Sequence, residues 1–375
     1  MILKKAWPLI LCICLIGCSE KIPLEKASLI LLVALDKSSD DEMKVGVSVP
    51  LFHHKEQKNT VEHWVRANSI YSGFSKIERR LTGYITPAKA EIILIGSKLA
   101  REDNWFQALD SSFRDPQAAI NAKILMVDGD PEKVLQVQRP DKPLLVSYIN
   151  DVIETSIHSN QAISSTVKQL LKEKNEPGMT QTIPVIKTER NQITTEGLAL
   201  LNKNGKYLTK ITKEDVKIFN LIYKSKKTGR TILHFPLSEN YSNQQSNLSV
   251  LVKNTKRSIN VDFHENKFMF DIDIDLDISL LERTNYKSPK GFEVSDQGER
   301  KIKIQIQKEL EKKLISMFHD FQKNKIDPIG LSMYAKAYQY NEWKKAKQNW
   351  LEHLSKAQIN INTHIKIKDI GTIHS

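Results

Sequence analysis

The sequence predicts an α+β protein built from several mixed sheet-and-helix domains, with no transmembrane span in the mature chain. In the first half, short apolar runs typical of strands alternate with helical patterns. In the second half, long strands of alternating polarity surround one long amphipathic helix. Beyond the amino-terminal segment, the chain never reaches the run of about 20 apolar residues that a membrane helix needs.

The amino terminus has the features of an export signal. Lys4 and Lys5 are followed by an uncharged stretch over residues 6–16, which is too short to span a bilayer. The stretch ends in Leu15-Ile16-Gly17-Cys18, and the chain then becomes polar. This pattern predicts a signal peptide over residues 1–17, cleavage between Gly17 and Cys18, and a covalent diacylglycerol and N-acyl lipid on Cys18. The alternatives are a plain signal peptide that contains a cysteine, or an uncleaved anchor.

Cysteine content and charge limit the other functions open to the chain. All three cysteines lie in the first 18 residues, so we expect neither a disulfide nor a cysteine zinc site in the mature protein. Loss of Lys4 and Lys5 lowers the formal charge of +12 by two, to +10. A basic protein held at a bilayer is attracted to anionic lipid headgroups. Export and scattered lysines argue against nucleic-acid binding.

The region of residues 18–190 is predicted to form an N-terminal α+β domain region, possibly two subdomains. Periodicity and turn residues predict strands over 28–36, 43–49, 90–95 and 122–127, and helices over 70–81, 103–113, from 130, 144–157 and 163–171. Residues 139–194 are otherwise less regular, and Pro177-Gly178 marks a break.

Residues 191–375 are predicted to form a C-terminal α+β domain. Asn204-Gly205 favours a hairpin turn between strands over 196–201 and 207–211. The remaining elements are a helix from 212 to 223, strands over 247–263 and 267–279, a helix over 295–323, further helix over 329–353 and a last strand over 358–370. The predicted core of residues 329–353 comprises Leu331, Tyr334, Tyr338, Trp343 and Trp350.

No catalytic or metal-binding constellation stands out. From Asp271 onward, carboxylates occupy positions 1, 3, 5 and 12 of an EF-hand spacing, but Leu276 stands where the loop needs glycine. The alternation instead predicts a strand with solvent-facing aspartates, which cross-strand lysines such as Lys253 or Lys256 could pair. His53, His54 and His63 lack a metal-binding spacing, and the sequence contains neither a serine-hydrolase elbow nor a nucleotide-binding glycine loop. We therefore expect no enzyme, no metal and no cofactor beyond the lipid on Cys18.

The ordered segments resemble the Ger(x)C family of spore germination lipoproteins over nearly the whole chain. The resemblance rests on Leu15–Cys18, the run from Leu29 to Lys37, Ala90–Gly96 with Leu99-Ala100, Phe113-Arg114-Asp115 with Val127-x-Gly129, Gly197–Leu201 with Gly205–Leu208, and a tryptophan-rich helix before a terminal strand ending at Ile370-Gly371. It implies a lipid-anchored C subunit of a spore nutrient-germinant receptor, required for the germination response.

The resemblance also implies partners and a location. The partners would be the A-type and B-type membrane subunits of the receptor, and the site would be the outer face of the spore inner membrane. The alternative function is a small-molecule-binding lipoprotein that serves a transporter. A cleft between two domains would favour that alternative.

Overall fold

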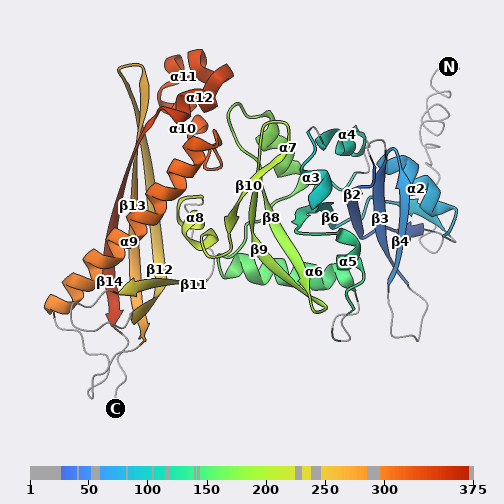
Figure 1. Cartoon of the computed structure of the whole chain (residues 1–375), viewed down its shortest axis with the longest axis horizontal. Coiled ribbons are helices and arrows are strands. Elements are labelled where there is room, and N and C mark those ends of the chain that lie inside the picture. Colours follow the sequence, from blue (N-terminus) through green and yellow to red (C-terminus); the bar gives the residue numbers. More distant parts are fainter. Residues whose placement is uncertain are drawn as a thin grey trace, which may run out of the picture.

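The computed structural model describes residues 27–39, 42–51, 60–81, 83–103, 105–114, 118–138, 141, 144–223, 230–237, 246–284 and 296–370. The molecule is elongated, with an eight-stranded sheet towards one end of its long axis and a four-stranded sheet at the other (Figure 1). None of the described helices is long and apolar enough to cross a membrane. The structure confirms the α+β fold class.

The larger sheet combines a parallel centre with antiparallel flanks. Its order is β10 (Tyr207–Thr212), β9 (Gln192–Leu201), β8 (Thr182–Glu189), β7 (Lys123–Val127), β6 (Ile92–Gly96), β2 (Leu32–Lys37), β3 (Met43–Pro50) and β4 (Thr60–Ala67). The pairs β2–β6, β6–β7 and β7–β8 are parallel. Central strands are covered on both faces, which explains why their sequences are nearly continuous apolar runs.

The strand predicted over 28–36 is divided. Its first part, β1 (Ala27–Leu29), pairs in parallel with β5 (Tyr84–Thr86) in a separate two-stranded sheet. Its second part is β2, which forms an antiparallel pair with β3. The chain leaves one sheet and enters the other at Ile30 and Leu31.

Helices cover both faces of the larger sheet. One apolar cluster lies beneath α2 (Ile70–Glu78), α4 (Phe106–Arg114) and α7 (Val167–Asn175). The other lies beneath α5 (Pro131–Leu135) and α6 (Leu145–His158). A short helix, α3 (Ser97–Ala100), follows β6 directly. The predicted start of α5 is confirmed, because Asp130 accepts a hydrogen bond from the Glu132 backbone N–H with Pro131 at the first helical position.

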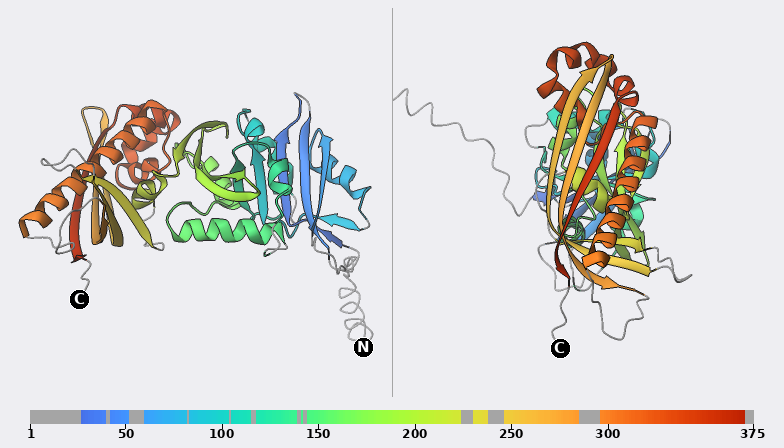
Figure 2. Two further views of the ribbon diagram at one scale, coloured as in Figure 1. Left: turned by 60° about the horizontal axis from the view of Figure 1, so that its bottom comes forward. Right: turned by 90° about the vertical axis from the view of Figure 1, so that its left-hand side faces the viewer.

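The smaller sheet has the order β11 (Thr231–Leu237), β12 (Ser246–His264), β13 (Lys267–Arg283) and β14 (Gln358–Ile370). The long helix α9 (Asp296–Lys323) packs on this sheet and runs close to β14 (Figure 2). Ile306, Leu310 and Leu314 of α9 are fully buried, as their spacing predicts. Strand β14 returns parallel to β13, because the helices between them reverse the chain.

Three short helices form the tip of the C-terminal region: α10 (Leu331–Tyr338), α11 (Tyr340–Ala346) and α12 (Trp350–Ser355). Leu331, Trp343 and Trp350 are buried as predicted, and Tyr334 is partly buried. The prediction for Tyr338 is wrong, since 69% of this residue is exposed. The backbone at Gln339 is not helical, so α10 ends at Tyr338 and the helical periodicity starts again after it. A single continuous helix over 329–353 therefore wrongly places Tyr338 on the buried face.

The two halves of the chain share one continuous body. Strand β8 was not predicted, and it pairs with β9 through a hairpin whose turn contains residue 190. Helix α8 (Val216–Tyr223) follows β10 and packs in the core of the smaller sheet. A division into domains at residue 190 stays a prediction, and it would fall within this hairpin.

Candidate functional site

The predicted lipidation and cleavage residues, Cys18 and Gly17, lie outside the described residues. His53 and His54 lie outside them too, and His63 sits half-buried on β4, where burial, together with Arg80, lowers its pKa. The described part of the chain contains no group of three metal-binding side chains.

The aspartates of β13 lie on the polar face of a regular strand. Ile272, Ile274, Leu276 and Ile278 are buried, as the alternation predicts. The carboxylate of Asp271 accepts a hydrogen bond from the Asn360 side chain at 2.8 Å, and Asp273 accepts one from Asn362 at 3.0 Å. Neighbouring β14 thus supplies hydrogen-bond donors to these two carboxylates.

The cross-strand lysines act differently from the prediction. Lys256 lies opposite Asp275 in the strand register, but the two form no ion pair among the described residues. Lys253 forms an ion pair with Asp369 of β14 at 4.0 Å. The lysine that pairs with an aspartate of β13 is Lys368, 3.9 Å from Asp277. Strand β14 was therefore the missing source of partners, because its parallel alignment with β13 joins segments about 90 residues apart and no local pattern reveals it.

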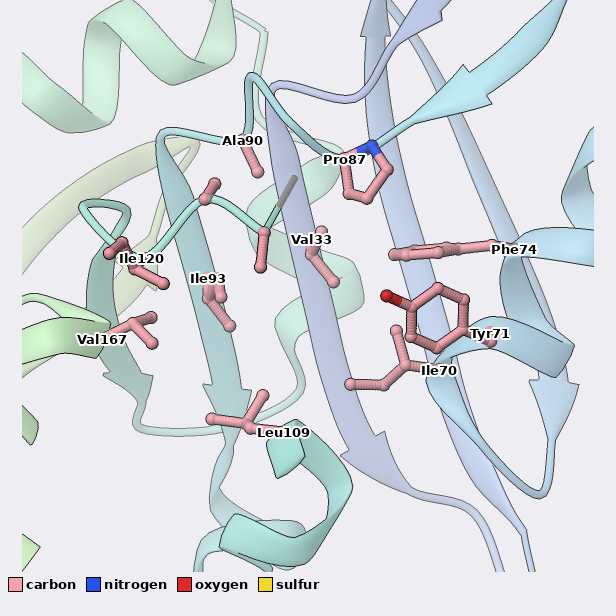
Figure 3. A pocket seen from close by; sticks show the side chains of 12 residues that line it. Val33, Ile70, Tyr71, Phe74, Pro87, Ala90, Ile93, Leu109, Ile120 and Val167 are labelled. Carbon is pink, nitrogen blue, oxygen red and sulfur yellow. The ribbon is translucent and has the colours of Figure 1, made fainter. Parts of the chain in front are cut away.

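An apolar pocket lies beneath α2 (Figure 3). Tyr71 and Phe74 of α2 and Pro87 border one side, and Val33 of β2 and Ile93 of β6 form the floor. Its volume is only about 40 Å³. That is room for a few water-sized spheres, well below the ~300 Å³ at which small-molecule sites begin. The pocket can receive one side chain but not a nutrient molecule.

A larger pocket lies between α7 and the start of α10. Its volume is about 690 Å³, within the range of small-molecule sites. Met179, Tyr223 and Met333 give it apolar walls, while Lys172 and Glu173 add charge. The side-chain amide of Gln169 donates to the Glu173 carboxylate at 2.8 Å and to the Tyr223 hydroxyl at 3.2 Å. Burial raises the pKa of Tyr223, so this hydroxyl stays neutral.

Beside this pocket, a buried aspartate joins the two halves of the chain. Asp327 accepts hydrogen bonds at 2.8 Å from the backbone N–H groups of Gly330, Leu331 and Ser332, and at 3.0 Å from the Trp350 indole. The Thr180 hydroxyl accepts from the Asp327 N–H at 2.8 Å. Burial raises the pKa of the Asp327 carboxyl, and the four donors oppose that shift.

The same junction holds the Pro177-Gly178 segment. The Ser332 hydroxyl donates to the Pro177 carbonyl at 2.6 Å and accepts from the Trp343 indole at 3.0 Å. Lys336 and Glu176 form an ion pair at 2.5 Å across the same contact. Asp327 was not predicted as a functional residue, although an aspartate three residues before Gly330 at a helix start is a local signal of a capping turn.

Two family models match nearly the whole chain. The model described as "Spore germination protein N-terminal domain" matches residues 20–188, and the model described as "Spore germination B3/ GerAC like, C-terminal" matches residues 196–371. These two matched regions, in this order and within a mixed α+β fold, place the chain in the class of Ger(x)C spore germination proteins. The chain belongs to this family.

Individual relatives are distant but aligned end to end. The spore germination protein GerQC of Bacillus cereus is 19% identical over 97% of both chains. The putative spore germination protein YfkR of Bacillus subtilis (strain 168) is 19% identical, covering 100% of this chain and 98% of its own. The crystal structure of the GerBC protein superposes with a TM-score of 0.58 at 17% identity, covering 90% of this chain and 97% of that chain. The shared fold therefore extends through both halves.

Proposed function

We propose that this protein is the lipid-anchored, non-enzymatic C subunit of a spore nutrient-germinant receptor and is required for the germination response. The observation that carries the proposal is the match of both family models, in order, over nearly the whole chain.

Anchoring is the second part of the proposal. The Leu15–Cys18 pattern after a short apolar stretch supports lipidation of Cys18. Two or more acyl chains hold a protein firmly at a bilayer, whereas one gives only marginal binding. Strand β1 begins at Ala27, nine residues after Cys18. The partners would be the A-type and B-type membrane subunits, and the location would be the outer face of the spore inner membrane.

The test is affinity purification of the tagged protein from detergent-solubilised spore membranes, followed by mass spectrometry. We expect recovery of a multi-span membrane protein and a second membrane subunit. The Cys18→Ala protein should lose both membrane retention and the germination response. Cys14→Ala is the matched control, because this cysteine lies in the same segment but before the predicted cleavage site. Recovery of the protein alone, from growing cells rather than spores, would contradict the proposal.

The alternative function, a small-molecule-binding lipoprotein serving a transporter, is favoured by one observation. The 690 Å³ pocket lies where the two halves of the chain meet, which is a common place for ligand sites. Thermal unfolding in the presence of a panel of amino acids, sugars and nucleosides tests it, because a ligand that binds only the folded state raises Tm. A rise that Met333→Trp abolishes would support the alternative, and no rise across the panel would remove its support.

A further inference from the structure

The outer surface of α2 and β5 combines tyrosines with unpaired cations. Tyr71 is 37% exposed and Tyr84 is 60% exposed. The exposed cations are Lys76, Arg79, Arg80 and Lys89. We call these six residues the α2 face. Within the described residues, no carboxylate forms an ion pair with any of the four cations.

Hydrogen bonds join α2 to the strands on either side of it, β4 and β5. The Glu78 carboxylate at the end of α2 accepts a hydrogen bond from the Ile85 N–H of β5 at 3.2 Å. Lys76 donates to the Arg66 carbonyl at 2.7 Å, which positions its ammonium group. Pro87, two residues before Lys89 in the chain, lies against Tyr71 and Phe74 (Figure 3). Two carboxylates near the α2 face, those of Glu78 and Glu91, already accept hydrogen bonds, from the Ile85 N–H and from the Asn150 side chain.

The chain itself places this surface close to the proposed anchor. Strand β1 pairs with β5 in the register Ala27 to Tyr84 and Leu29 to Thr86. Cys18 lies nine residues before Ala27. Because an extended residue spans at most ~3.6 Å, the lipid on Cys18 cannot be more than about 32 Å from the start of β1. Tyr84 is the direct register partner of that strand start, so the α2 face lies within reach of the bilayer.

We infer that the α2 face rests on the anionic surface of the bilayer. The inference rests on the proposed lipid anchor, and it adds the orientation of the protein on the membrane. Each Lys or Arg near an anionic surface contributes about 1 kcal/mol of attraction, and tyrosine rings favour the headgroup region because they are both apolar and polar. The positive charge of the face complements anionic headgroups, and the short tether keeps the face near the bilayer. We therefore take phospholipid headgroups as the binding partner of this face.

The opposite end of the molecule offers a matched control. The tip formed by α11 and α12 also has an exposed tyrosine, Tyr340, and exposed lysines at Lys344, Lys347 and Lys356. It lies with the smaller sheet, whereas α2 lies at the other end of the long axis (Figures 1 and 2). The composition of the two surfaces is similar, and only the α2 face is tethered next to the anchor.

The test uses the unacylated chain from Ser19 onward, which contains every described element, with vesicles of phosphatidylcholine alone or mixed with phosphatidylglycerol. We expect co-sedimentation with the mixed vesicles only, weakened by salt. Neutralising three cations of the α2 face, Lys76→Gln with Arg79→Gln and Lys89→Gln, should lower the partition coefficient about 100-fold. The same charge change at Lys344, Lys347 and Lys356 should leave it unchanged.

Equal loss of binding in both triple variants, or no binding of the wild-type chain to anionic vesicles, would overturn the inference. A further variant, Tyr84→Ser, should weaken binding without changing charge, which separates the headgroup contact from attraction by net charge alone. Each protein is first checked for an unchanged Tm, as expected for exposed positions. The lipid on Cys18 is absent from this assay, so its outcome is separate from the Cys18→Ala test of the anchor.

Discussion

At the scale of single residues, Asp36 is a charged group held inside the fold. It lies near the end of β2 and is 2% exposed. One carboxylate oxygen, Oδ1, accepts hydrogen bonds from the Lys37 N–H at 2.9 Å and from the Leu99 N–H of α3 at 3.0 Å. Gly96 leaves room for it, since a Cβ at residue 96 would overlap the Asp36 side chain. Burial raises the pKa of the Asp36 carboxyl, and the two backbone hydrogen bonds oppose the shift.

Asp36→Asn should stabilise the protein at neutral pH, because an amide oxygen can accept both backbone hydrogen bonds without a buried charge. A folded pKa above the unfolded value of 3.8 means that the native state binds the proton more tightly. The wild type therefore loses stability as the pH rises through the raised pKa. The advantage of Asn should be present at pH 7 and vanish as the pH falls towards 3.8, which urea unfolding at several pH values measures.

Asp128→Asn is the control for this prediction. Asp128 follows β7 in the same sheet, but it is exposed and forms an ion pair with Lys210 at 3.5 Å. An exposed ion pair contributes little to stability, so this change should alter the free energy of unfolding only slightly at any pH. A gain at neutral pH that is equal in both variants would contradict the argument from burial.

The sequence could place Asp36 at a strand end but not show that it is buried. A polar residue at the end of an apolar run is typical of a turn in solvent, and the groups that enclose Asp36 come from Gly96 and Leu99, about 60 residues later. The same limit applies to Tyr338, whose exposure depends on a helix break at Gln339. The burial of a single residue is therefore mispredicted where its neighbours come from distant segments of the chain or where one backbone turn changes the direction of its side chain.

At the scale of elements, α9 protects the edge of the smaller sheet. Thr363 lies on β14, the edge strand of the described sheet. The Glu311 carboxylate accepts from the Thr363 N–H at 3.1 Å and from its hydroxyl at 2.9 Å, while the Gln307 amide donates to the Thr363 carbonyl at 2.5 Å. Side chains of a helix thus replace the missing neighbouring strand, which limits edge-to-edge association.

Glu311→Ala should lower the free energy of unfolding by about 2 kcal/mol, because it leaves the buried Thr363 N–H without an acceptor. Urea unfolding measures this change, and light scattering should show more association as the strand edge opens. Glu309→Ala, two residues earlier on α9, is the control, since Glu309 forms no hydrogen bond to β14 among the described residues. Equal effects of the two changes would refute the protective role of Glu311.

Elements with a strong period were predictable, and those whose pattern is interrupted were not. The alternation over 358–370 and the spacing over 295–323 each specify one buried face, and both predictions are confirmed. Strand β8 was missed because Pro184 interrupts its apolar run and argues against a central strand. The structure tolerates this proline because β7 pairs only with Val185 and Ile186.

At the scale of the whole molecule, the two halves are joined by packing as well as by the chain. Helix α8 lies in the core of the smaller sheet, while β9 and β10 belong to the larger one. The buried Asp327 contacts add a second connection through Thr180 and Ser332. Motion of one half can reach the other only through such contacts, so the junction determines whether the halves move together.

Gly178 provides the sharpest test of that junction. Its φ is +84°, and a Cβ at this position would overlap the indole ring of Trp350, which donates to Asp327. Gly129 has φ +133° with open space around it, so Gly129→Ala is a matched control for backbone strain alone. Strain should cost about 1–3 kcal/mol in both variants. Overpacking should add about 1–3 kcal/mol in Gly178→Ala only.

Trp350 lies at the junction, so its fluorescence reports on the packing there. We expect Gly178→Ala to change tryptophan fluorescence before global unfolding. We also expect the two halves of this variant to unfold in two separate transitions instead of one. Gly129→Ala should keep a single transition. If the halves are held mainly by α8, unfolding of Gly178→Ala will stay in one step although its stability is lowered. That result would place the coupling of the two halves in the β9–β10–α8 connection rather than in the Asp327 junction.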